Sequence, residues 1–160
     1  MLDLVIVEAD LDNRQHQGAI VSMIKAYARD PMGGGRELPG EVCRNLIPGL
    51  RQHPTTLIFL AYAGEEPVGI AVCFRGFSTF AARPLLNIHD LAVVPDYRGR
   101  GVGRRLLERV EARGRELGCC KLTLEVRDAN QTAQQLYWRA GFRHAASDAG
   151  TRTWFLERRL

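Results

Sequence analysis

Short apolar runs rich in Val, Ile and Leu alternate along the chain with amphipathic stretches. Such a short run predicts a β-strand, and apolar residues at positions i, i+3, i+4 and i+7 predict a helix. The predicted strands cover residues 2–8, 55–63, 68–74, 85–94, 121–126, 142–146 and 151–158. The predicted helices run from Asp10 or Asp12 to Pro31, from near Pro39 to Leu50, from 102 to 117 and from 130 to 140. This order of elements predicts an α/β domain.

Glycine and proline mark the boundaries between these elements. Residues 30–35 read Asp-Pro-Met-Gly-Gly-Gly and predict a loop. Pro48 and Gly49 should kink or end the second helix. Residues 64–67, Gly-Glu-Glu-Pro, predict the four-residue turn of a β-hairpin.

The composition is that of one globular domain spanning residues 1–160, since 46% of the residues are hydrophobic and 25% are charged. The formal net charge of +4 suits an anionic small ligand about as well as nucleic acid. No zinc-finger spacing or aromatic-studded basic stripe is present, so we expect no nucleic-acid partner.

The cysteines and the N-terminus indicate a cytoplasmic protein. The four cysteines contain no C-x-x-C pair, which predicts free thiols, no metal site and a reducing compartment. The first eight residues carry acids and lack the features of a signal peptide, and no 18-residue apolar run occurs. We therefore expect no contact with a membrane.

A glycine-rich stretch joins the strand at 85–94 to the helix at 102–117. It reads Arg98-Gly99-Arg100-Gly101-Val102-Gly103-Arg104. Unpaired backbone N–H groups at a helix start bind phosphate oxygens, and the helix dipole assists. The stretch lacks the Gly-Lys-Ser/Thr ending of a P-loop, and its glycine spacing is not that of a dinucleotide fingerprint.

Two motifs make the chain resemble the GCN5-related N-acetyltransferase (GNAT) superfamily. The first is Val93-x-Pro95-x-x-Arg98-Gly99-x-Gly101-x-Gly103, similar to its acetyl-CoA signature. The second is Asn130-x-x-Ala133-x-x-Leu136-Tyr137-x-x-x-Gly141-Phe142. The resemblance fits the element order along nearly all of the chain and weakens before residue 55. It implies a mixed central sheet of about seven strands that splays after the fourth strand, with about four helices on its faces.

The resemblance also implies that acetyl-CoA is the cosubstrate and lies in the gap of the sheet, with no metal involved. Its pantetheine arm would pair with the backbone of Leu91, Ala92 and Val93, beside Asn130. Its pyrophosphate would lie on the glycine stretch, with contacts from Arg98, Gly99, Arg100, Gly101, Val102, Gly103 and Arg104. A basic loop independently suits a ligand with three phosphates.

Candidates for acid–base chemistry come from three places. By the resemblance, Tyr137 occupies the family position whose hydroxyl protonates or hydrogen-bonds the CoA sulfur, and the alternative is a core aromatic. Glu125 lies in a Leu-Glu-Val run similar to bacterial enzymes that acetylate protein N-termini, where this glutamate is the base; pairing with Arg127 is the alternative. His89 and Asp90 precede the expected splay and are further candidates for the base, which stays open.

The expected activity is transfer of an acetyl group from acetyl-CoA to a primary amine, by direct attack in a ternary complex. A small amine or amino-acid-like metabolite is the first choice of acceptor, and a protein N-terminus or lysine is the alternative. A non-catalytic acyl-CoA-binding domain is a second alternative. The loop with Met32 and Gly33–Gly35 either closes over the substrate or is a plain connector. A homodimer through an edge strand also stays open.

Overall fold

The computed structural model describes residues 3–145 and 156–159. Five strands form one sheet in the order β1-β2-β3-β4-β5. They are β1 (Leu4–Glu8), β2 (Thr56–Ala63), β3 (Glu66–Ser78), β4 (Arg83–Val93) and β5 (Leu122–Leu124). The helices are α1 (Arg14–Arg29), α2 (Gly40–Gln52), α3 (Val102–Glu116) and α4 (Gln131–Arg139), with a 3-10 turn at Pro95–Tyr97. The sheet is mixed, because β4 and β5 are parallel and the other neighbours are antiparallel.

The expectation of about seven strands is wrong for the described part of the chain, which contains five. Residues 142–145 are not a strand. The Phe142 N–H donates to the Tyr137 carbonyl at 3.0 Å, and the Arg143 guanidinium donates to the Trp138 carbonyl at 3.0 Å. This segment is therefore held by the end of α4 instead of a neighbouring strand. Most of the other expected strand, 151–158, lies outside the described residues.

Helix α1 begins later than the sequence predicted. The side-chain oxygen of Asn13 accepts hydrogen bonds from the N–H groups of Gln15 and His16 at 2.8 and 3.2 Å. Asp10 instead accepts from the N–H of Asp12 at 2.8 Å. The cap is therefore Asn13, because its side chain and not that of Asp10 reaches the first free N–H groups of the helix.

Helix α2 continues through Pro48 to Gln52, so the prediction that it could end at Pro48 is wrong. A proline removes one backbone donor from a helix. Neighbouring Leu46, Ile47 and Leu50 pack against the core formed with α1, and this packing holds the helix together beyond the proline. The predicted hairpin is present, but its loop has two residues, Gly64 and Glu65, instead of four, because Ala63 pairs with Glu66. The other predicted helices are present, and β5 is shorter than expected.

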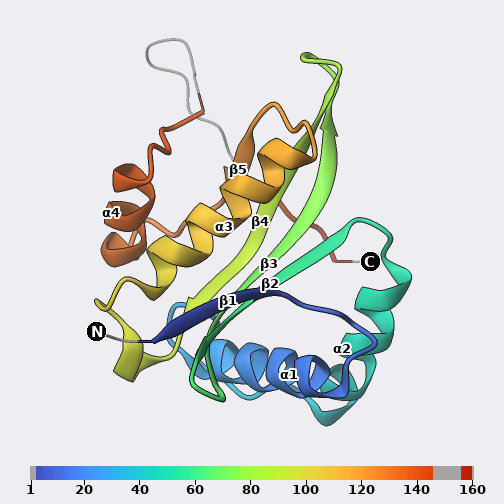
Figure 1. Cartoon of the computed structure of the whole chain (residues 1–160), viewed down its shortest axis with the longest axis vertical. Coiled ribbons are helices and arrows are strands. Elements are labelled where there is room, and N and C mark those ends of the chain that lie inside the picture. Colours follow the sequence, from blue (N-terminus) through green and yellow to red (C-terminus); the bar gives the residue numbers. More distant parts are fainter. Residues whose placement is uncertain (1–2, 146–155, 160) are drawn as a thin grey trace.

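The sheet separates two apolar cores (Figure 1). One face is covered by α1 and α2, with Ile20, Met23 and Ile70 fully buried there. The opposite face is covered by α3, where Leu106 and Val110 lie against the sheet, and Tyr137 of α4 completes this core. The buried apolar residues thus follow the helical and strand periods that the sequence predicted.

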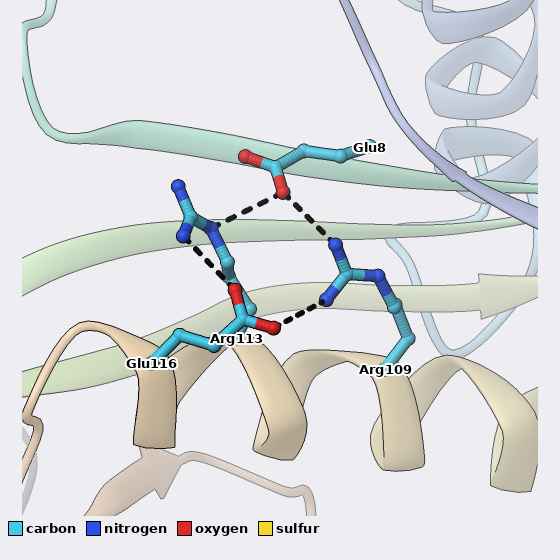
Figure 2. Close-up of polar contacts among 4 residues, drawn as sticks. All are labelled: Glu8, Arg109, Arg113 and Glu116. Atoms are coloured by element: carbon cyan, nitrogen blue, oxygen red, sulfur yellow. Dashed lines mark hydrogen bonds and ion pairs between the residues drawn. The ribbon is translucent and has the colours of Figure 1, made fainter.

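A four-residue ionic network fixes α3 to the edge strand β1 (Figure 2). The Glu8 carboxylate receives Arg109 at 3.3 Å and Arg113 at 3.2 Å. Glu116 pairs with the same two arginines, at 3.8 Å and 3.0 Å. The network therefore anchors the helix whose N-terminus carries the glycine stretch.

Candidate functional site

A gap opens between β4 and β5. The two strands pair over only three residues, the last pair being Ile88 with Leu124, whereas β4 runs on to Val93. Pairing between β4 and β3 continues through Val93. The second half of β4 is thus paired on one side only and exposes its backbone to the gap.

The register determines which residues of β4 offer backbone groups to the gap. The Val94 N–H donates to the Val68 carbonyl of the β3 side at 3.0 Å. Because backbone groups alternate between the two sides of a strand, those of Ala92 also face β3, and those of Leu91 and Val93 face the gap. Leu91 and Val93 are therefore positions where an extended ligand could pair with the strand.

A β-bulge turns His89 and Asp90 to the same face of the sheet. Val72 pairs with Asp90 and Cys73 pairs with Ile88, so His89 is the extra residue. Asp90 shares its face with Val72, which belongs to the core under α1. The His89 ring lies 5.5 Å from that of Phe74, which packs on the same core. Strict alternation would have separated these two residues.

The glycine stretch forms a tight turn into α3. Gly99 and Gly101 have φ values of 72° and 84°, which favour glycine. The first helical bond of α3 runs from the Arg105 N–H to the Gly101 carbonyl at 3.0 Å. The N–H groups of residues 102–104 therefore precede the first intrahelical acceptor and are available to an external one.

Gly103 contributes a close approach between helices instead of a turn. A Cβ atom at this position would lie 2.9 Å from Cδ2 of Leu136. The absence of a side chain therefore lets α4 approach the start of α3, which brings the second motif beside the first.

A cavity of about 1090 Å³ lies between α3, α4 and the end of β4. Eight of the predicted cofactor residues line it: Leu91, Val93, Arg98, Gly99, Gly101, Val102, Gly103 and Arg104. The other three lie outside the lining. Ala92 packs on the α1 side, Arg100 lies over the Tyr97 ring and Asn130 caps α4. Cations add to the lining at Arg115, Lys121, Arg139 and Arg143. The cavity thus suits a long ligand with several phosphates.

Tyr137 is buried beside this cavity. Asn130 accepts a hydrogen bond from the Ala133 N–H at 3.1 Å and so starts the helix that carries Tyr137. Burial raises the pKa of Tyr137 to about 12, and the nearby Tyr27 phenol adds to the rise. Its hydroxyl is therefore protonated at neutral pH and able to donate a proton or hydrogen bond.

The three candidate bases have different surroundings. Burial raises the pKa of the Asp90 carboxyl, and the neighbouring His89 acts in the opposite direction. His89 is exposed and has only the Phe74 ring as an aromatic neighbour on β3. Glu125 is exposed just beyond the end of β5. Asp90 is therefore the most buried of the three candidates, and a carboxyl whose pKa is raised by burial is typical of groups that transfer protons near neutrality.

Three further residues gather on the α1 side of the gap. Burial raises the pKa of Tyr27, and the charges of Asp90 and Asp30 raise it further while Arg127 lowers it. Arg127 Nη1 lies 3.5 Å from the Pro31 carbonyl. Tyr27 was hidden in the sequence as one more apolar position of a helix. Asp30 carried a weak signal, since it directly precedes Pro31 at the helix end.

The described residues contain neither a membrane-spanning helix nor a cluster of metal ligands. Over residues 3–145 and 156–159, no helix has the length and apolarity needed to cross a bilayer. In the same ranges, no three His, Cys, Asp or Glu residues gather closely enough to hold a metal ion.

Comparison with known proteins identifies the family. The chain is 33% identical over 79 residues to a thialysine N-epsilon-acetyltransferase of Caenorhabditis elegans, covering 49% of each protein. It is 37% identical over 86 residues to the N-alpha-acetyltransferase MAK3 of Arabidopsis thaliana, covering 54% of this chain and 44% of that one. The chain thus spans about half or less of these relatives' length.

The fold agrees with a solved structure described as a probable acetyltransferase. The TM-score is 0.79 at 22% identity, over 96% of this chain and 97% of that one. A family model of the acetyltransferase (GNAT) family matches residues 15–142. The chain therefore belongs to the GNAT acetyltransferase family.

Proposed function

We propose that this protein is an N-acetyltransferase that moves an acetyl group from acetyl-CoA to the primary amine of a small or amino-acid-like molecule, by direct attack in a ternary complex. One observation carries the proposal. The half of β4 that is not paired with β5 carries Asp90 and leads into the glycine turn, after which residues 102–104 have free N–H groups, and Tyr137 is buried in the core under α3.

Acetyl-CoA is the cosubstrate of GNAT acetyltransferases, and the chain offers groups that could bind it. The backbone of Leu91 and Val93 would pair with the pantetheine arm. The N–H groups and basic side chains of residues 98–104 would hold the pyrophosphate. Asn130, already bound through its Oδ1, would lie along the arm with its amide group. These residues orient the thioester without supplying a nucleophile of their own.

Asp90 and Tyr137 divide the proton transfers. The acceptor nitrogen attacks the thioester carbonyl carbon, a C–N bond forms and the C–S bond breaks. Asp90 accepts the proton that the amine loses, since its raised pKa brings the carboxyl closer to neutrality. Tyr137 donates its hydroxyl proton to the leaving thiolate, a role that its pKa of about 12 allows at neutral pH.

The acceptor class follows from the charge at Asp90. A partly buried carboxylate attracts an ammonium group, and both relatives named above act, by their names, on amines: a side-chain amine in one and an α-amine in the other. A small amine is the first choice. A protein N-terminus is the second, because the Leu124-Glu125-Val126 run supports it.

A screen for release of CoA thiol tests the proposal. Acetyl-CoA would be offered with small polyamines, amino acids, lysine-like amines and peptides with free N-termini. We expect thiol release with at least one small amine. Release with peptides alone would move the acceptor to protein N-termini, and a melting-temperature shift with acetyl-CoA but no release would leave a non-catalytic binding domain. If millimolar acetyl-CoA gives no thiol release and no melting-temperature shift, the proposal is refuted.

A further inference from the structure

Asp30, at the C-terminal end of α1, holds the glycine loop of residues 31–35 together. Its backbone carbonyl accepts the N–H groups of Gly33, Gly34 and Gly35 at 2.9, 3.1 and 3.0 Å. Its Oδ1 accepts the N–H of Met32 at 2.9 Å. The N–H groups of four consecutive residues thus donate hydrogen bonds to Asp30, and we take the loop as an ordered structure instead of a plain connector.

The loop is also sterically locked onto α1. A Cβ atom on Gly33 would lie 1.9 Å from the Tyr27 carbonyl oxygen, so the backbone packs directly on the helix at this point. The Pro31 carbonyl lies near Arg127 on the far side of the gap. The loop therefore forms a wall of the region that contains Tyr27, where the amine is expected.

Arg98 of the glycine stretch connects this wall to the cofactor cavity. Its Nη2 donates to Asp30 Oδ2 at 2.6 Å, and its Nε donates to the Val93 carbonyl at 2.9 Å. The Asp30 side chain is 14% exposed and the Arg98 side chain 48% exposed, so solvent reaches this ion pair from the Arg98 side and screens it in part. Arg98 and then the Met32 N–H hold the pKa of Asp30 below its usual value, which keeps the carboxylate charged.

We propose that Asp30 is a positioning residue that couples the two substrate sites: acetyl-CoA on the glycine stretch fixes Arg98, and Arg98 through Asp30 fixes the 31–35 wall for the amine. This inference rests on the proposed function. The same guanidinium holds the wall and the Val93 carbonyl at the edge of the gap, so ordering one end orders the other. By linkage, the amine then favours acetyl-CoA binding by the same factor.

Amide hydrogen exchange with acetyl-CoA as the only ligand tests the coupling without an identified acceptor. We expect acetyl-CoA to slow exchange at residues 99–104 and, by about tenfold, at Met32 and Gly33–Gly35. In Asp30→Asn the amide can still accept the Met32 N–H but loses the charge that holds Arg98. Protection at 99–104 should remain, and protection at 32–35 should disappear.

Two other variants complete the test. Glu37→Gln removes the exposed Arg29–Glu37 pair of the same segment, at 2.6 Å, and should behave as wild type. Arg98→Lys covers the case in which Asp30→Asn does not fold. A lysine lacks the planar guanidinium that binds the Asp30 carboxylate and the Val93 carbonyl at once, so protection at 32–35 should again be lost.

The outcomes separate the two proposals. Protection at 99–104 without any at 32–35 in wild type would overturn the coupling and leave the acetyltransferase proposal intact. Persistence of loop protection in Asp30→Asn, or its loss in Glu37→Gln, would overturn the role of Asp30. An absence of protection in both segments would overturn the proposed function and the coupling with it.

Discussion

Replacing Tyr137 by phenylalanine removes a single oxygen atom from a side chain that is 8% exposed. With a pKa of about 12, about one Tyr137 hydroxyl in 100,000 is ionised at pH 7, so nearly every molecule has a protonated hydroxyl that can act as the acid. Losing a positioned general acid costs about 10²- to 10⁴-fold in kcat. We therefore expect a fall of that size, with KM for acetyl-CoA little changed because the cavity lining stays intact.

Tyr62→Phe is the matched control. Tyr62 is also 8% exposed, but it lies in the core under α1, and its buried hydroxyl has no hydrogen-bond partner. Removing that hydroxyl should leave kcat within about twofold and keep or slightly raise Tm, because no hydrogen bond is lost.

Initial rates of thiol release with the acceptor found in the screen, and melting curves for both variants, give the answer. A Tyr137→Phe enzyme with kcat within about threefold of wild type would refute Tyr137 as the acid. Equal losses in Tyr62→Phe would show that the effect is one of packing.

Three further predictions use other parts of the molecule. Because burial raises the pKa of Asp90, its carboxylate forms only as pH rises through that raised value, and kcat/KM should rise over the same pH range. The buried charged form also destabilises the fold, so Asp90→Asn should lose activity yet show a higher Tm at pH 7. A lower Tm would contradict this. Glu8→Gln leaves Arg109 and Arg113 with Glu116 as their one shared carboxylate in the network, so Tm should fall in dilute buffer and the deficit should shrink at 1 M salt; a salt-independent deficit would argue against an ionic cause. In Gly101→Ala the added Cβ atom meets no other atom within 4 Å, but the alanine must adopt a φ of 84°, at a cost of about 1–2 kcal/mol. We therefore expect titration calorimetry to show weaker acetyl-CoA binding, with kcat nearly retained. Unchanged affinity would show that the turn tolerates the strain.

The elements themselves could largely be predicted from sequence. Apolar positions of α3 repeat at helical spacing and bury Leu106 and Val110 as expected. Gly99 and Gly101 marked the turn because few other residues adopt positive φ. The start of α4 was correctly predicted at residue 130, where Asn130 caps the helix. These features depend on local geometry, which a short stretch of sequence determines.

The ends of elements were predicted less well. Pro48 stays inside α2 because tertiary packing outweighs the loss of one hydrogen bond. β5 ends at Leu124, which leaves Glu125 outside the strand. At Pro48, contacts with the core under α1 decide the outcome, and the local sequence does not contain them.

By itself, then, the sequence determined where the glycine turn, the flanking strand and the helix of Tyr137 lie, since each depends on residues close together in the chain. Only the tertiary structure decided how they combine. A one-residue bulge turns His89 and Asp90 to the same face, and strand alternation cannot reveal a bulge. Arg98, 68 positions from Asp30 in the chain, reaches that carboxylate only because α1 ends beside β4. The partners in such contacts are selected by the packing of the whole chain.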